Sequence, residues 1–401
     1  MLPLVRPMLA AGLLLAAPAA ALAQEAGWPM SGGNPAHAVR ADGPGPPYRV
    51  AWTADLEGGA AAGPVTTDEA AIVVGKDSVT ALSLATGAEM WTAPRSEGAT
   101  GSPAVAGGLV VFAVGTGDDA AIVAVTAEDG QEAWRTSVPA AVLAGLTAVA
   151  VAGEAEGTVY AASRDGVVAA LDLATGEERW TYEAGTAVEG TPAVAEDLVI
   201  VVAQSTTART ATVHAVDADT GRKAWTRAGL TASASAVAVA GGQAFVGTGD
   251  GRVRALDAAT GDLRWETRVR YSFSPESVPA VTDDLYVGDL FGHLYRLDPS
   301  DGAERWVFRV PGDLLRGTSV PVDRWVVAGD ASGQVSAIDA RSGHLVWRHD
   351  LGAGRVLAPA PGGSVLVTAV AGGDVTAFET DPGADLLDEP SPTTLFVDRA
   401  L

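Results

Sequence analysis

Short runs of alternating apolar residues recur along the chain, and segments of small residues precede them. Runs of this kind include 198–202, 243–246 and 324–327, and small-residue segments include 63–65, 101–103, 190–192, 277–279 and 317–319. Alternation with a period of two is typical of a half-buried β-strand. Small side chains suit strands that crowd around a central axis. The pattern predicts an all-β protein in which a small-residue strand is innermost in each unit.

A turn motif of the approximate form A-x-D-x-x-T-G-x-x-x-W occurs seven times along the chain. The copies span 81–91, 124–134, 170–180, 215–225, 255–265, 296–306 and 337–347. Trp52 precedes the first copy, and successive tryptophans of the series are 39 to 46 residues apart. A repeat of this length is expected of a four-stranded propeller blade. The chain is therefore predicted to be a β-propeller of four-stranded antiparallel blades.

The glycine and the tryptophan of the motif are expected to have separate structural roles. The glycine, Gly176 for example, supplies the positive φ of a turn between two strands of one blade. An indole buries roughly 150–250 Å², and at about 25 cal/mol per Å² this area is worth several kcal/mol. Each tryptophan is therefore expected to dock its blade against the next. The predicted docking residues are Trp52, Trp91, Trp134, Trp180, Trp225, Trp265, Trp306 and Trp347.

The last unit lacks its fourth strand, and the first tryptophan lacks a blade. Residues 358–361, 364–367 and 375–378 supply three strands, whereas 48–52 carry Trp52 with no three strands before it. We expect the N-terminal strand to complete the last blade and to close an eight-bladed ring, since closure removes exposed strand edges. The alternative is a seven-bladed ring with the last unit as an appendage.

The chain divides into four predicted regions. Residues 1–23 have one early cation, an apolar middle and small residues at the end, which is typical of a secretory signal peptide cleaved near Ala23 or Gln24. Residues 24–47 are expected to form an irregular segment over one face, 48–380 the propeller, and 381–401 an acidic tail in which 395–397 could dock back. The protein is therefore expected to be periplasmic or extracellular.

Composition and charge narrow the class of partner. The chain is 48% hydrophobic and 19% charged, which is enough apolar residue to bury a core. A net charge of −23 argues against nucleic acid and anionic lipid as partners, and favours a soluble monomer over the alternative of a surface that recruits a basic partner. The chain has no cysteine, which excludes disulfides and a cysteine lipid anchor, and no later segment is long enough to span a bilayer.

The repeat between Trp52 and Phe378 resembles the PQQ-like repeat of the quinoprotein propellers. The opening segment 27–35, Gly-Trp-Pro-Met-Ser-Gly-Gly-Asn-Pro, is similar to the leader often seen before such propellers. The resemblance implies the propeller fold. The family includes pyrroloquinoline-quinone dependent dehydrogenases, BamB-type outer-membrane assembly proteins and exported propellers of unassigned role, so the resemblance leaves several functions open.

Chemistry-bearing residues separate these functions. Quinoprotein alcohol dehydrogenases of this kind clamp the quinone between a tryptophan and a disulfide beside a calcium ion, and this chain has no cysteine and no matching acidic set. The five histidines are not arranged as a chelating group, and the acidic stretch 217–221 coincides with a repeat turn. We therefore expect no catalytic residue, no cofactor and no metal.

The leading hypothesis is an exported, non-catalytic scaffold that binds a protein or peptide, nearest in plan to BamB-type proteins but without their lipid anchor. The alternatives are a quinone-dependent oxidoreductase and a sugar- or polymer-binding propeller. Loops that enter the innermost strands are the expected binding surface, because a rigid ring displays them at the mouth of its channel, and an ordinary solvated rim is the alternative. The candidate partner-binding residues are Arg270, Tyr271, Phe273, Glu276, Arg316, Arg355 and Glu189.

Overall fold

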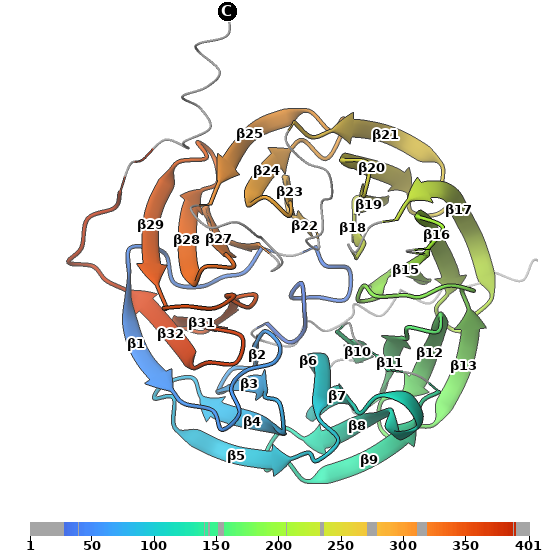
Figure 1. Cartoon of the computed structure of the whole chain (residues 1–401), viewed down its shortest axis with the longest axis horizontal. Coiled ribbons are helices and arrows are strands. Elements are labelled where there is room, and N and C mark those ends of the chain that lie inside the picture. The colour runs from blue at the N-terminus through green and yellow to red at the C-terminus, as the bar shows by residue number, and fades with distance from the viewer. Residues whose placement is uncertain are drawn as a thin grey trace, which may run out of the picture.

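Eight four-stranded antiparallel sheets stand around a central axis in the computed structural model (Figure 1). The structure describes residues 28–38, 40–139, 141–142, 145–150, 156–205, 207–232, 236–270, 279–310, 319–387 and 389. Within these ranges each sheet forms one blade, and its first strand lies nearest the axis while its fourth lies at the rim (Figure 1). The predicted all-β, eight-bladed propeller is confirmed.

The first four blades follow one another along the chain. Blade 1 contains β2 (Val65–Thr66), β3 (Ala70–Val74), β4 (Ser78–Ser83) and β5 (Glu89–Pro94). Blade 2 contains β6 (Ala99–Ala106), β7 (Leu109–Val114), β8 (Ala121–Thr126) and β9 (Glu132–Ser137), with a 3₁₀ turn at Gly117–Asp119. Blade 3 contains β10 (Thr147–Ala150), β11 (Gly157–Ala162), β12 (Val167–Asp172) and β13 (Glu178–Glu183). Blade 4 contains β14 (Ala193–Ala195), β15 (Leu198–Ser205), β16 (Thr210–Asp217) and β17 (Lys223–Thr231).

The other four blades repeat the same plan. Blade 5 contains β18 (Ala238–Ala240), β19 (Gln243–Thr248), β20 (Arg252–Asp257) and β21 (Leu263–Arg268). Blade 6 contains β22 (Ala280–Val281), β23 (Leu285–Gly288), β24 (His293–Leu297) and β25 (Glu304–Arg309). Blade 7 contains β26 (Val320–Val322), β27 (Trp325–Gly329), β28 (Gln334–Asp339) and β29 (Leu345–Asp350). Blade 8 contains β30 (Ala360–Gly362), β31 (Val365–Ala369), β32 (Val375–Thr380) and β1 (Tyr48–Ala54).

Blade 8 joins the two ends of the propeller. Strand β1 pairs antiparallel with β32, with Val50 opposite Phe378 and Trp52 opposite Ala377. Strand β1 therefore supplies the outer strand that the last repeat lacks, as the position of Trp52 predicted. The N-terminal closure is confirmed, and the seven-bladed alternative is wrong.

One hydrogen bond is repeated at every junction between neighbouring blades. The indole N–H of each series tryptophan donates to a backbone carbonyl of the next blade at 2.8–2.9 Å. The acceptors, in order, are the carbonyls of Leu84, Ala127, Leu173, Ala218, Ala258, Pro299, Ala340 and Tyr48. In the first seven junctions the turn glycine of the next blade also lies against the indole. Because a buried indole N–H needs an acceptor, each junction satisfies the group that it buries.

In blades 3 to 7 an aspartate holds the turn before the outer strand. In blade 3, Asp172 Oδ1 accepts hydrogen bonds from the amides of Ala174 and Thr175, and Oδ2 accepts one from Arg179. The Arg179 guanidinium, together with these amides, holds the pKa of the Asp172 carboxyl below its usual range. The same self-bonding occurs at Asp217, which accepts from the amide and hydroxyl of Thr220. The acidic stretch at 217–221 thus serves its own turn.

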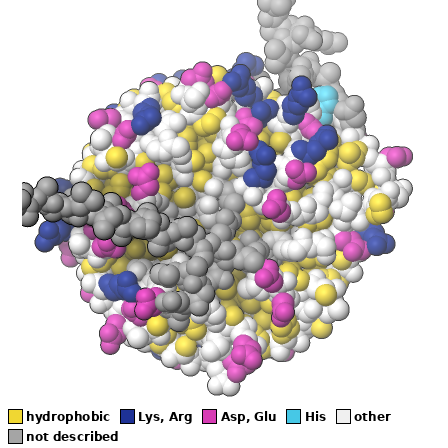
Figure 2. All heavy atoms as spheres, turned by 180° about the vertical axis from the view of Figure 1, so that it is seen from behind, with side chains coloured by type: hydrophobic (Ala, Val, Ile, Leu, Met, Phe, Trp, Pro, Cys, Tyr) yellow, Lys and Arg dark blue, Asp and Glu magenta, His cyan; other side chains and the backbone are white. Residues whose placement is uncertain are grey.

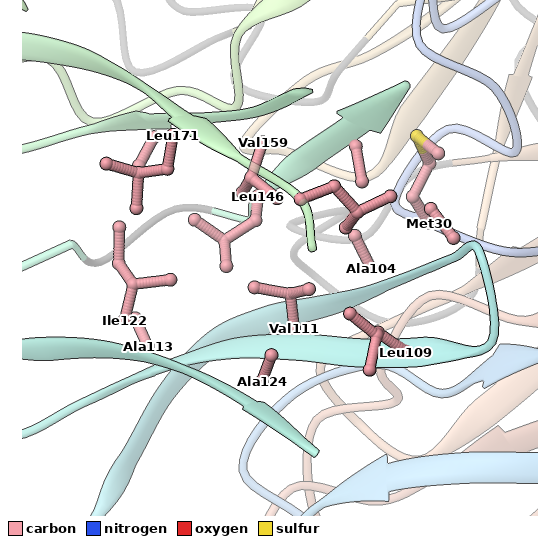
Figure 3. Close-up of a cluster of buried hydrophobic side chains, with 14 of the residues drawn as sticks. Met30, Ala104, Leu109, Val111, Ala113, Ile122, Ala124, Leu146, Val159 and Leu171 are labelled. Atoms are coloured by element: carbon pink, nitrogen blue, oxygen red, sulfur yellow. The ribbon is translucent and has the colours of Figure 1, made fainter. Parts of the chain in front are cut away.

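The hydrophobic core consists of clusters that lie between blades. In the described part of the chain, each of eight buried clusters draws its strand residues from two neighbouring blades. Figure 3 shows the cluster between blades 2 and 3, where Ile122 and Val111 face Leu146 and Leu171. Apolar area removed from water at each junction stabilises the ring by about 25 cal/mol per Å². The ring is thus stabilised junction by junction.

The ring has two faces, which differ in the connections that they carry. We call the hairpin face the one that bears the turns between first and second strands and between third and fourth strands, and the loop face the opposite one. The connections from one blade to the next lie on the loop face. Residues 28–47, which we call the leader, run from Trp28 to the start of β1 and cross the middle of the ring in blue (Figure 1). No helix among the described residues is long and apolar enough to cross a membrane.

Candidate functional site

The leader makes one circuit along the inner strands at the hairpin face. Its backbone exchanges hydrogen bonds of 2.6–3.1 Å with blades 1, 2, 4, 5 and 7. These bonds join Trp28 to Thr66, Pro29 to Val105, Pro35 to Val194, Ala36 to Val239, and Ala41 to Pro321 and Asp323. Blade 6 is reached by an ion pair between Arg40 and Asp283 at 3.1 Å. The inner edges of these blades are therefore paired by the protein's own chain.

The turn in the leader also fills space near the axis. Gly33 and His37 donate backbone hydrogen bonds to the carbonyls of Met30 and Asn34, so 30–37 fold as two consecutive turns. The Cβ of Ser31 would lie 3.4 Å from a Cβ built on Gly145, at the start of the inner strand of blade 3. The leader therefore reaches into the channel, where it occupies room that a ligand would need.

His37 is buried at the end of the turn segment 30–37, next to blade 5. Its side chain is 1% exposed, and Nδ1 donates to the carbonyl of Val237 at 2.8 Å, which leaves Nε2 without a partner among the described residues. The imidazole of His37 also lies against Gly32, where an added Cβ would be 2.7 Å from it. Burial lowers the pKa of His37 to about 4, because a charged imidazolium would lose its hydration there. Burial against the leader and blade 5 therefore keeps His37 neutral at pH 7.

On the loop face, one predicted residue forms a contact between two blades. Glu189, in the connection into blade 4, accepts a hydrogen bond from Gln204 Nε2 at 2.9 Å. Its other carboxylate oxygen lies 3.8 Å from the guanidinium of Arg164, in the turn between the second and third strands of blade 3. The Arg164 side chain is 60% exposed and that of Glu189 is 30% exposed. Sequence reasoning missed Arg164 and Gln204, because neither belongs to the repeated motif.

Two other predicted residues lie apart from this pair. Arg270 follows the outer strand of blade 5, and its Nε lies 3.4 Å from Glu304 Oε1 in the outer strand of blade 6. It is therefore placed between two outer strands, and no ion pair or hydrogen bond between described residues links it to Glu189. Arg355 is half-buried in the connection into blade 8, where its carbonyl accepts from Ala371. The other four candidates, Tyr271, Phe273, Glu276 and Arg316, lie outside the described residues.

In blades 6 and 7, where arginines cluster, nearby carboxylates neutralise much of their charge. In Figure 2, Lys and Arg side chains cluster at the upper right, the sector of blades 6 and 7, with Asp and Glu between them. In these blades Arg296, Arg305 and Arg324 each pair with an aspartate of the same blade. Arg324 also lies over the ring of Trp325 at 4.4 Å from its centroid. The arginines named here are therefore largely neutralised by aspartates of their own blades.

The eight blades, their tryptophan junctions and the closing N-terminal strand define the protein as a β-propeller built of PQQ-like repeats. The chain belongs to the family whose model is described as outer membrane protein assembly factor BamB, which matches residues 48–155, 118–278 and 273–394. No curated protein matches the chain.

Solved structures show the same fold at low sequence identity. The crystal structure of BamB from Moraxella catarrhalis is 18% identical and covers 84% of this chain and 99% of its own, with a TM-score of 0.66. The quinohemoprotein alcohol dehydrogenase from Comamonas testosteroni is 15% identical and covers 92% of this chain and 83% of its own, with a TM-score of 0.69. The computationally designed Ika8 protein is 18% identical with a TM-score of 0.67, covering 81% of this chain and 98% of its own. An assembly factor, an enzyme and a designed protein share this fold, so the fold alone does not assign a function.

Proposed function

We propose that the protein is an exported, non-catalytic scaffold that holds a protein or peptide partner on its loop face. The observation that carries the proposal is the leader inside the ring. Its backbone pairs with the inner strands along the hairpin face, and its turn at 30–37 reaches into the channel. The loop face then remains as the surface where the connections between blades are presented to a partner.

The loop face carries groups suited to polar recognition. Arg164 and Glu189 form a half-exposed pair whose partners come from different blades, and Gln204 fixes the carboxylate. A partner can add hydrogen bonds to both members without separating them, since the guanidinium keeps free donors. Charged groups of this kind set the orientation and specificity of docking more than its affinity. Arg355 adds a further cation on the same face.

Membership of the BamB family supports a role in the cell envelope. The family description names outer membrane protein assembly, and the predicted signal peptide at 1–23 would deliver the mature chain to the same compartment. We therefore propose the periplasm as the site of action and an envelope protein as the partner. Without a cysteine anchor, the protein would reach that partner by diffusion and electrostatic docking.

Site-specific photo-crosslinking tests the face that is used. A benzoylphenylalanine placed at 164, 189 or 355 in the full chain, expressed in its source cells, is expected to give one shared adduct. The same probe at Arg324 or Arg341, in turns of the hairpin face, is the matched control and should not give that adduct. With the probe at 355, the adduct should also weaken in an Arg164→Glu variant. A shared adduct from the hairpin-face positions alone would contradict the proposal.

Binding of pyrroloquinoline quinone would favour the alternative function, a quinone-dependent oxidoreductase, over the scaffold. The leader occupies room in the channel, so we expect no saturable change in tryptophan fluorescence on titration with pyrroloquinoline quinone at micromolar concentration. A saturable change accompanied by dye reduction with alcohols or sugars would overturn the proposal.

A further inference from the structure

The leader passes the inner strand of blade 3 without pairing with it. The amides of Val105 and Val194, in the inner strands of blades 2 and 4, donate to leader carbonyls at 2.7 and 2.6 Å. Val149 holds the matching position in β10, within the repeated Ala-Val-Ala triplet, and no backbone hydrogen bond joins it to the leader among the described residues. Between its contacts with blades 2 and 4 the leader folds into the turn at 30–34 instead of running along β10, and Ser31 of that turn lies near Gly145, two residues before β10. Within the described residues, β10 is thus one of the inner strands that the leader leaves without a backbone hydrogen bond, together with β22 of blade 6 and β30 of blade 8.

A pocket lies at the place that the leader bypasses. It has a volume of about 290 Å³ and is bounded by the leader on one side and by the inner strands of blades 2, 3 and 4 on the other. Its principal lining residues are Met30, Pro35, Val105, Val149, Val194 and Glu196. Met30, seen in Figure 3 above Ala104 and Leu109, belongs to the cluster between blades 2 and 3, so this wall is anchored in the core. The volume is sufficient for one large apolar side chain.

The chemistry of the pocket is apolar with one acidic edge. Among the described residues, its lining includes no lysine, arginine or histidine, and Glu196 is the one charged residue. Glu196 is exposed and lies in the hairpin between β14 and β15 with φ of 53°. The matching turn positions in blades 2 and 5 are Gly107 and Gly241, with φ of 56° and 55°. A glutamate is less favourable than glycine at this left-handed position, and here it places a residue with an acidic side chain in the pocket lining.

We propose that this pocket binds an extended peptide in which a large apolar side chain is followed closely by lysine or arginine. The apolar side chain would enter between Met30 and Val194, and the cation would meet the Glu196 carboxylate. The backbone would lie along β10 as the leader lies along the neighbouring inner strands, with a carbonyl on the Val149 amide. The leader itself shows that the inner strands accept an extended chain in this way, which is strand addition between segments of one protein.

Two features favour an extended peptide of this kind: the acidic rim of the pocket and the inner edge of β10, which the leader does not pair. An acidic rim beside an apolar floor disfavours an acidic or purely polar peptide, because its charge would be repelled or its polar groups left without partners. The site lies on the hairpin face, away from the loop-face surface proposed above, and it does not depend on that proposal. Failure of the crosslinking experiment leaves the peptide site standing, and failure of the peptide experiment leaves the loop face standing.

The test uses four fluorescein-labelled, capped hexapeptides of alanine, titrated against the full mature chain by anisotropy. They carry Leu and Lys, Leu and Glu, Lys alone, or Leu alone, with Lys or Glu two residues after the Leu position. We expect the Leu and Lys peptide to bind with a Kd of about 0.1 mM, which is typical of a short segment with one anchoring side chain. The Lys-alone and the Leu and Glu peptides should bind at least tenfold more weakly.

Two variants separate the parts of the proposed site. Glu196→Lys should weaken the Leu and Lys peptide at least fivefold and strengthen the Leu and Glu peptide. Asp323→Lys is the matched control, because Asp323 holds the same turn position in blade 7 with φ of 49°, and it should change neither affinity. Val149→Pro removes the amide donor at a position where blades 7 and 8 already carry Pro321 and Pro361, and it should weaken every peptide that binds.

The outcomes decide for or against the pocket. Equal affinities for the four peptides, unchanged affinities in both Glu196→Lys and Val149→Pro, or no binding up to millimolar protein would overturn the proposal. So would dimerisation that depends on Val149 in sedimentation, since the occupant would then be a second copy. If Val149→Pro fails to fold, as judged by circular dichroism and thermal melting, the comparison of Glu196→Lys with Asp323→Lys still decides.

Discussion

His37 links the stability of the protein to pH through a single buried side chain. Its folded pKa of about 4 lies below the usual value of 6.5, so the unfolded chain binds a proton more readily than the folded one between these values. The stability that depends on a neutral imidazole is therefore complete above pH 6.5 and is lost as the pH falls toward 4. A shift of this size corresponds to about 3 kcal/mol.

The variant His37→Asn tests this linkage. Asparagine tolerates the left-handed backbone at this position, where φ is 55°, and it does not titrate in this range. Urea unfolding at pH 7 and pH 4.5 should show a smaller loss of unfolding free energy in the variant than in the parent chain. His344→Gln, in a repeat turn of blade 7, should retain the parental loss. An equal loss in all three proteins would contradict the assignment to His37.

At the scale of the blade, the repeated contact between turn glycine and tryptophan predicts which glycines matter. A Cβ on Gly176 would lie 2.4 Å from the indole of Trp134, and its φ is 72°. Gly185 has a similar φ of 84° but open space around it. Gly176→Ala should therefore add overpacking to the backbone cost and destabilise the protein by about 2–4 kcal/mol, whereas Gly185→Ala should cost only about 1 kcal/mol.

Chemical denaturation followed by tryptophan fluorescence measures both variants. The difference between them isolates the clash with Trp134, because the two positions share the left-handed backbone. Equal losses of unfolding free energy would mean that the blade junction relaxes around the added methyl group. The contact would then not limit how closely neighbouring blades approach.

At the scale of the whole molecule, stability depends on the closing strand. Strand β1 completes blade 8, places Trp52 against blade 1 and gives the carbonyl of Tyr48 to Trp347. Tyr48 also meets Trp347 edge to face at 4.9 Å between ring centroids. Deleting 48–56 should therefore remove several kcal/mol of stability and expose the edge of β32. Removing 390–401 should change the melting temperature by no more than a few degrees.

Thermal melting and size-exclusion chromatography distinguish the two deletions. The shorter ring should melt at lower temperature and associate through its open edge, whereas the chain without 390–401 should stay monomeric. The tail does contact the ring before that point, since Leu387 and Glu389 exchange backbone hydrogen bonds with β29. Equal stability of the two deletions would contradict the role assigned to β1.

The parts of the molecule that could be predicted are those encoded within one repeat. Trp52 without a blade and a last unit without a tryptophan together indicated closure, because each strand needs a partner. The predicted site residues fared differently. Glu189 meets Arg164 of another blade, Arg270 is turned toward Glu304, and four further candidates lie outside the described residues. Neither of these two ion pairs recurs from blade to blade, so the repeated sequence motif could not predict them.

The sequence by itself determined the order of the blades and the residues that dock them, because each repeat encodes the same hairpin and the same junction. It predicted eight blades, and the pairing of β1 with β32 excluded the seven-bladed alternative. The tertiary structure alone decided what the two faces present. The leader is irregular and has no period of its own, yet the ring brings the inner strands of distant blades within reach of it. That convergence places the leader along the inner strands, buries His37 and leaves the inner edge of β10 without a backbone hydrogen bond to the leader, and it exists only after the ring has closed.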